Sequence, residues 1–147
     1  MRRFLIGILL AFIANSAFSE SFVSGKWQAF EKSRLGYRSA ILEVDENGQG
    51  FFVYTFSEKF DPELVLKISV NEGEFNKRYG FLELDEVNGV KHRLLISHAN
   101  FSEPQIMVMV YVEGLDKTLE FSEVWVLNKT FTRFIDKELY EFAKKNL

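Results

Sequence analysis

The sequence predicts an all-β protein: a single antiparallel up-and-down eight-stranded β-barrel with a C-terminal α-helix packed outside it. Seven clusters of turn-forming residues recur at intervals of about 12–16 residues, with strand-like sequence between them. Those segments alternate apolar and polar residues, which is typical of half-buried strands. Short connections favour antiparallel neighbours, and closing the sheet into a barrel removes both exposed edges.

Residues 1–19 are predicted to be a signal peptide. Met1-Arg2-Arg3 is positively charged, residues 4–13 are apolar, and Ala17-Phe18-Ser19 places small residues before a cleavage point. Ten apolar residues in a helix span about 15 Å, too short for stable insertion across a membrane. An uncleaved amphipathic or anchoring helix and cleavage after Ala17 are the alternatives. The mature barrel domain, including the final helix, is therefore expected over residues 20–147.

Seven predicted turns divide this domain into eight strands. The turns lie at residues 33–36, 46–48, 60–62, 71–73, 88–89, 100–104 and 113–116. The strands between them are predicted at Gly25–Lys32, Tyr37–Asp45, Gln49–Ser57, Glu63–Val70, Phe75–Glu86, Val90–His98, Gln105–Val112 and Lys117–Asn128.

Near the C-terminus the apolar period changes from two to about 3.6, which predicts a helix over residues 132–146. Its apolar stripe consists of Phe131, Ile135, Leu139 and Phe142. Thr132 could cap its start. The third and seventh strands are apolar on both faces and need cover on both sides. The helix could cover one of them, and a homodimer interface could cover the other.

Composition narrows the classes of function. Lys and Arg number 18 against 21 Asp and Glu, so no basic excess points to nucleic acid. The chain contains no Cys, which excludes disulfides, thiolate nucleophiles and cysteine-ligated zinc. An exported domain without disulfides favours the periplasm of a Gram-negative bacterium, with secretion as the alternative. No metal-ligand cluster, phosphate-binding glycine loop or nucleophile elbow is visible, so no cofactor and no catalytic residues are predicted.

The triplet Gly25-Lys26-Trp27 stands at the start of the first strand, followed by a meander and a helix. It resembles the first motif of the lipocalins and of the wider calycin superfamily, which includes avidin-like barrels. The resemblance covers nearly the whole mature chain and implies that Trp27 closes one end of the barrel, with Arg133 packed on it. The Thr-Asp-Tyr element of lipocalins is missing: the corresponding loop reads His98-Ala99-Asn100-Phe101-Ser102.

Polar residues on apolar strand faces are the candidate ligand contacts. Glu123 lies between Phe121 and Trp125, on the predicted inward face of the last strand. A carboxylate there would be a ligand anchor if that face lines a cavity; otherwise it lies in a wet mouth or pairs with a basic residue. Tyr54 and Tyr111 could present hydroxyl groups to the same cavity, or could simply pack.

The two histidines have the same parity in the sixth strand. A tight Asn88-Gly89 turn would pair Val87 with Val90, hence Asp85 with His92 and Tyr79 with His98. Asp85 with His92 could transfer protons, although a surface salt bridge is the favoured interpretation. His98 would be either a polar cap or a contact in the lumen.

Two functions remain. The first is an exported, non-enzymatic binding protein for a small, largely apolar ligand, contacted by Trp27, Tyr54, His98, Tyr111, Phe121, Glu123 and Trp125. The second is a protein-interaction module, such as an inhibitor or envelope-assembly factor, with a filled core and an apolar contact patch. A weak enzyme is the third and least favoured alternative.

Overall fold

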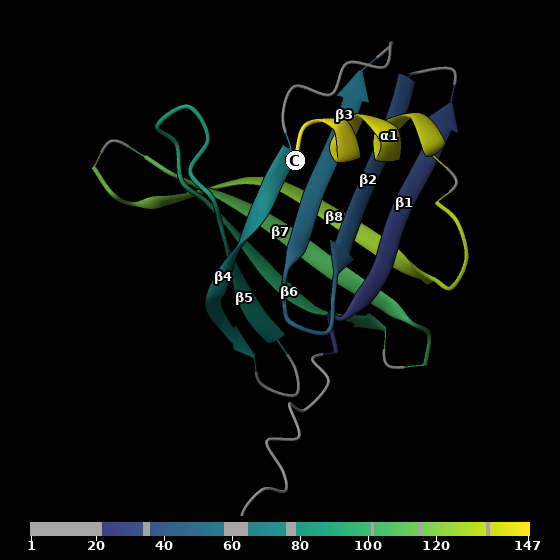
Figure 1. The fold of residues 1–147 in the computed structure, drawn as a ribbon, viewed down its shortest axis with the longest axis horizontal. Helices are drawn as coiled ribbons and strands as arrows, with labels where there is room; N and C mark the ends of the chain where they lie inside the picture. The colour runs from purple at the N-terminus through teal and green to yellow at the C-terminus, as the bar shows by residue number, and fades with distance from the viewer. Residues whose placement is uncertain are drawn as a thin grey trace, which may run out of the picture.

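Eight antiparallel strands close into one barrel in the computed structural model, which confirms the predicted fold class (Figure 1). The structure describes residues 22–33, 36–57, 65–75, 79–100, 102–114, 116–134 and 136–147. The strands are β1 (Gly25–Ser33), β2 (Gly36–Val44), β3 (Gly50–Ser57), β4 (Val65–Phe75), β5 (Tyr79–Leu84), β6 (His92–Asn100), β7 (Gln105–Glu113) and β8 (Leu119–Thr130). The predicted signal peptide, the turn at residues 60–62 and Ile135 lie outside the described residues.

The first and last strands of the barrel, β1 and β8, pair with each other over only part of their length in the described structure. β1 and β2 pair along their whole length, from Gly25 opposite Val44 to Ser33 opposite Gly36. The described pairing of β1 with β8, by contrast, covers three residues on each strand, Lys26–Gln28 against Asn128–Thr130. The two strands are therefore joined where β1 begins and diverge toward the end where β8 begins. Figure 1 shows β5–β8 running behind and across β1–β3.

One predicted turn is wrong. β4 runs straight through Asn71-Glu72-Gly73, and its register against β5 shifts between Ile68 and Gly73. A glycine inside a strand often marks such a bulge rather than a reversal of the chain. β5 is consequently only six residues long, much shorter than the predicted Phe75–Glu86 strand.

The C-terminal helix packs outside the barrel, as predicted, but it begins later. Helix α1 spans Lys137–Lys145, and Asp136 rather than Thr132 caps it: its Oδ1 accepts the Leu139 N–H at 3.0 Å. The predicted stripe is also partly wrong, because Phe131 is 81% exposed. The buried side chains that join the helix segment to β2 and β3 are Phe134, Leu139, Ala143, Ile41, Phe51 and Val53. The sequence predicted that the third and seventh strands need cover on both faces, and the helix covers the third, β3.

Asp136 also links the helix to the barrel wall. The Tyr37 hydroxyl donates a hydrogen bond to Asp136 Oδ2. Burial, followed by this hydrogen bond and the negative charge of Asp136, raises the pKa of Tyr37. One buried carboxylate thus serves both as helix cap and as anchor to β2.

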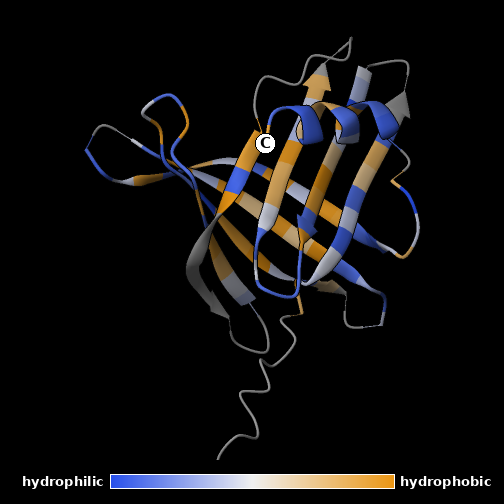
Figure 2. Ribbon diagram, in the orientation of Figure 1, coloured by the Kyte–Doolittle hydropathy of each residue, from blue (hydrophilic) through white to orange (hydrophobic). Residues whose placement is uncertain are grey.

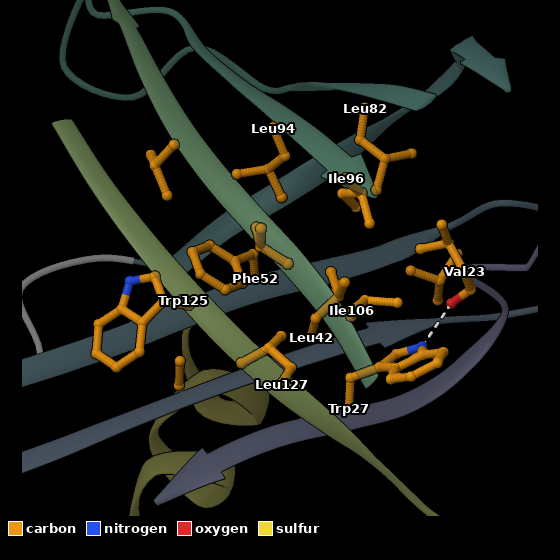
Figure 3. Packing of buried hydrophobic residues seen from close by; sticks show 14 of the residues in the cluster. Val23, Trp27, Leu42, Phe52, Leu82, Leu94, Ile96, Ile106, Trp125 and Leu127 are labelled. Atoms are coloured by element: carbon orange, nitrogen blue, oxygen red, sulfur yellow. Dashed lines mark hydrogen bonds between the residues drawn. The ribbon is translucent and has the colours of Figure 1, made fainter. Parts of the chain in front are cut away.

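Side chains fill the middle of the barrel. Hydrophobic residues gather along the strands, whereas hydrophilic ones gather in the loops and on the visible side of α1 (Figure 2). Eleven side chains of the described core cluster are fully buried: Val23, Ala40, Leu42, Phe52, Leu66, Leu94, Ile96, Ile106, Val108, Val110 and Leu127. Figure 3 shows several of them, among them Leu42, Phe52 and Ile106, packed together. Because none of these eleven exposes surface to a water-sized sphere, the lumen between them is packed like a protein core.

Candidate functional site at the Trp125 end of the barrel

The first end of the barrel, where β1 begins, is sealed around Trp27. The Trp27 indole Nε1–H donates to the Val23 carbonyl at 2.7 Å, which folds the chain before β1 across the opening (Figure 3). Phe22 stacks on the His98 ring, with centroids 4.4 Å apart. The cation over the Trp27 ring is Lys129, whose Nζ lies 5.3 Å from the centroid, whereas Arg133 is exposed. The packing of Arg133 on Trp27 implied by the calycin resemblance is therefore replaced by Lys129. We call this region the Trp27 end.

The opposite end is built around the second tryptophan. Arg38 lies on the inward side of β2, and its guanidinium carbon is 4.3 Å from the centroid of the Trp125 ring. Tyr54 contacts the same indole, with centroids 5.6 Å apart, and stacks parallel to Phe56 at 6.3 Å. Glu123, opposite Val110, is half-buried on the same side of β8. We call Arg38, Tyr54, Phe56, Glu123 and Trp125 the Trp125 end.

A buried polar atom at this end has no partner. Trp125 is only 2% exposed, and its Nε1 is hydrogen-bonded to nothing in the described part of the chain. An indole N–H can only donate, and buried tryptophans usually satisfy it. A buried donor without a hydrogen-bond partner lowers the stability of the folded state by roughly 1–3 kcal/mol. The local structure therefore presents a donor that an incoming acceptor atom would satisfy.

Arg38 spans the part of the seam where β1 and β8 have diverged. Its Nη2 donates to the Val124 carbonyl of β8 at 2.7 Å, directly from β2. The side chain is exposed, so this hydrogen bond and the contact with Trp125 compete with water. Arg38 thus covers the Trp125 indole with a side chain that can swing away without unfolding any strand.

The seven predicted ligand contacts do not form one site. Tyr54, Glu123 and Trp125 come together at the Trp125 end, whereas Trp27 and His98 lie at the sealed end. The predicted inward position of Phe121 is wrong: the register of β7 and β8 shifts after Val110–Glu123, so Phe121 faces Tyr111. Both rings then lie on the outside of the barrel, 6.0 Å apart and edge to face, and Phe121 is 57% exposed. A bulge of one residue reverses the face of every residue before it.

The same kind of shift separates the predicted histidine pairs. Val87 pairs with Val90, as the Asn88-Gly89 turn predicted. Farther along, however, Glu83 faces Arg93 and Tyr79 faces Ser97. The predicted pairs of Asp85 with His92 and of Tyr79 with His98 are therefore wrong, and an ion pair in this hairpin joins Arg93 to Glu83.

His92 is buried instead of paired at the surface. It begins β6, at the same end of the barrel as Trp125, and is 8% exposed. Its Nδ1 has no hydrogen-bond partner among the residues that the structure describes. Burial lowers the pKa of His92, and a hydrogen bond to the Val90 backbone opposes this effect only in part. The inward side of this end thus holds two buried polar atoms, Trp125 Nε1 and His92 Nδ1, that lack partners in the described residues, while Ser39 Oγ and Thr55 Oγ1 are in the same state on the outward side of β2 and β3.

Arg38 is the residue of this candidate site that sequence reasoning missed. A signal was present, because Arg38, Ala40, Leu42 and Val44 alternate along one strand and the last three are plainly inward. An arginine at the end of an inward row is the same kind of exception as Glu123. What the pattern does not contain is its contact with Trp125, 87 residues away.

Comparisons of the chain with protein families, curated proteins and solved structures gave no match. The calycin resemblance therefore stays a prediction. Within the described ranges, no group of three or more His, Asp or Glu side chains is arranged to hold a metal ion. No helix among those residues is both long enough and apolar enough to cross a membrane.

Proposed function

We propose that this chain is an exported, non-enzymatic binding protein that takes a small, largely apolar ligand at the Trp125 end. The observation that carries the proposal is the buried Trp125 N–H, which lacks a partner in the described residues and lies beneath an exposed arginine. Proteins rarely leave a buried donor unsatisfied, and such exceptions gather at functional sites.

The surrounding side chains define what the ligand must offer. Phe56 and Tyr54 supply stacked aromatic surface beside the indole. The Trp125 N–H requires an acceptor atom, and the Arg38 guanidinium favours that acceptor being negatively charged. Since the middle of the lumen is filled, the ligand sits near the mouth and not deep in the barrel. It would enter by displacing Arg38 from the ring.

A fluorescence titration with 8-anilinonaphthalene-1-sulfonate tests this site, because the probe combines aromatic rings with an anionic acceptor. We expect Arg38→Met and Trp125→Phe each to weaken binding about tenfold, equivalent to about 1.4 kcal/mol. Lys129→Met, which removes the matching cation at the Trp27 end, is the control and should leave binding unchanged. Equal affinities in all four proteins would rule out a site at Trp125.

Export is tested separately. The chain is expressed in a Gram-negative bacterium and the periplasmic fraction is analysed by intact-mass spectrometry. We expect a mass that lacks residues 1–19, or residues 1–17 if cleavage follows Ala17. A full-length chain confined to the cytoplasm would contradict the proposal.

A filled barrel that acts as a protein-interaction module is the second candidate function. The observation that favours it is the apolar outer side of β5–β8, where Tyr79, Phe121, Val124 and Val126 are each at least 40% exposed. Large exposed apolar patches usually mark interaction sites.

A further inference from the structure

The outer surface of β5–β8 is a strand surface that α1 leaves uncovered in the described structure. The helix covers the outside of β2 and β3. On the far side of the barrel from the helix, behind β1–β3 in Figure 1, strands β5–β8 form a continuous layer. β7 was one of the two strands whose sequence demands cover on both faces. Its inward row is buried in the core, whereas its outward row is only half-buried.

Register aligns the outward apolar side chains into rows across four strands. Phe81 on β5 faces Leu95 on β6, Leu95 faces Met109 on β7, and Met109 faces Val124 on β8. The next row contains Tyr79 on β5, the polar Ser97 on β6, Met107 on β7 and Val126 on β8. We call these eight side chains the outer face.

Polar pairs border the outer face on two sides. The Glu83–Arg93 ion pair lies one row beyond Phe81 and Leu95. At the opposite border, Gln105 Nε2 donates to Asn128 Oδ1 at 2.8 Å. An apolar centre enriched in aromatic residues and Met, with a polar rim, is the usual composition of a protein–protein interface. The centre itself carries no charged side chain, so two copies could approach without like-charge repulsion across it.

We infer that the outer face binds a second copy of this chain. The sizes of its side chains argue for this occupant: the aromatic residues Tyr79 and Phe81 lie on β5, whereas the valines Val124 and Val126 lie on β8. A two-fold axis parallel to the strands, between β6 and β7, would set β5 of one copy on β8 of the other. Each aromatic ring would then face a valine, Leu95 would face Met109 and Ser97 would face Met107, so large side chains meet small ones at the edges of both rows.

The outer face would form the centre of a dimer interface. A stable interface buries about 800 Å² per partner and involves roughly 20–30 residues on each side. Four strands with two apolar rows and a polar rim supply the central part of such an interface. Two sheets packed face to face through apolar side chains form a layer about 10 Å thick, as in a β-sandwich. This inference does not depend on the proposed ligand site, which lies on the inward side of the barrel wall at the Trp125 end.

Sedimentation of the full chain between 1 and 100 µM tests the inference. We expect the wild type to sediment as a dimer, and Val126→Glu, a change at an exposed position, to weaken association at least tenfold. Phe131→Glu is the matched control, because Phe131 is exposed outside the outer face. A wild type that stays monomeric at 100 µM, or a dimer that Val126→Glu does not weaken, would overturn the inference.

Cysteine cross-linking tests the arrangement, helped by the lack of native Cys. Phe81→Cys combined with Val124→Cys should form a covalent dimer on oxidation. Three strand spacings, about 14 Å, separate these positions within one copy, which is too far for an internal disulfide. The control pair, Tyr79→Cys with Phe121→Cys, does not meet across the proposed axis and should remain uncross-linked. Cross-linking of the control pair alone would overturn the arrangement.

Discussion

The two ends of the barrel contain the same three kinds of side chain in different states. At the Trp27 end, the indole N–H is bonded to Val23, Lys129 lies over the ring, and His98 stacks on Phe22. At the Trp125 end, Arg38 lies over the ring, but neither Trp125 Nε1 nor His92 Nδ1 has a hydrogen-bond partner in the described chain.

The difference comes from what crosses each end. The segment before β1 supplies a backbone carbonyl to Trp27 and closes the opening next to the paired part of the seam. At the other end the seam has diverged, and one exposed side chain, Arg38, does the covering. A cover formed by the backbone is fixed in place, whereas a cover formed by an exposed side chain can move aside. This difference is the reason for proposing the binding site at the Trp125 end and a structural role for the Trp27 end.

The largest expected effect is on stability, from replacing each tryptophan with phenylalanine. Trp27→Phe should lower the free energy of unfolding by about 2–4 kcal/mol, because it removes the hydrogen bond to the Val23 carbonyl and creates a cavity. Trp125→Phe should cost about 1 kcal/mol or less, since the lost packing is offset by removal of an unsatisfied donor. Urea unfolding of both variants measures the difference, and equal losses would erase the distinction between the two ends.

The pH dependence of stability should depend on the buried His92. Burial lowers the pKa of His92 below 6.5, so the unfolded chain binds more protons than the folded one as pH falls below that value. Stability contributed by neutral His92 is thus present above pH 6.5 and is lost toward the lower pKa of the folded state. Urea midpoints at pH 7.5 and 5.5 should show this loss in the wild type. His92→Gln should reduce the loss, and an unchanged pH dependence would show that His92 is not its source.

The smallest stability effects are expected from the two cations. Lys129→Met and Arg38→Met each remove a cation–π contact between a half-buried or exposed cation and a buried indole, worth about 0.5–1 kcal/mol. Thermal unfolding should therefore place both variants close to the wild type. The sulfonate probe should distinguish them, because only Arg38 lies over the indole assigned to binding. If Lys129→Met bound the probe more weakly than Arg38→Met, the result would indicate that the probe binds at the Trp27 end and not at the Trp125 end.

Turn chemistry and alternation were sufficient for the architecture. The eight strands, their antiparallel order and the external helix follow from residues such as Asn88-Gly89 and from the change of period near Phe131. Each depends on interactions between residues close in the chain. The predicted site fared differently: Tyr54, Glu123 and Trp125 came together, whereas Phe121 and Tyr111 lie outside and Arg38 was missed.

The misplaced residues share one physical cause. Alternation specifies a side chain's face only relative to its neighbours, and a bulge such as the one between Val110 and Tyr111 reverses that face with no clear mark in the sequence. The Arg38–Trp125 contact and the unsatisfied indole depend on where β1 and β8 diverge. That point is set by long-range register around the whole barrel, and no local pattern encodes it. Local propensity was enough to specify a closed sheet with a helix, but the site arises only when distant strands are brought into contact.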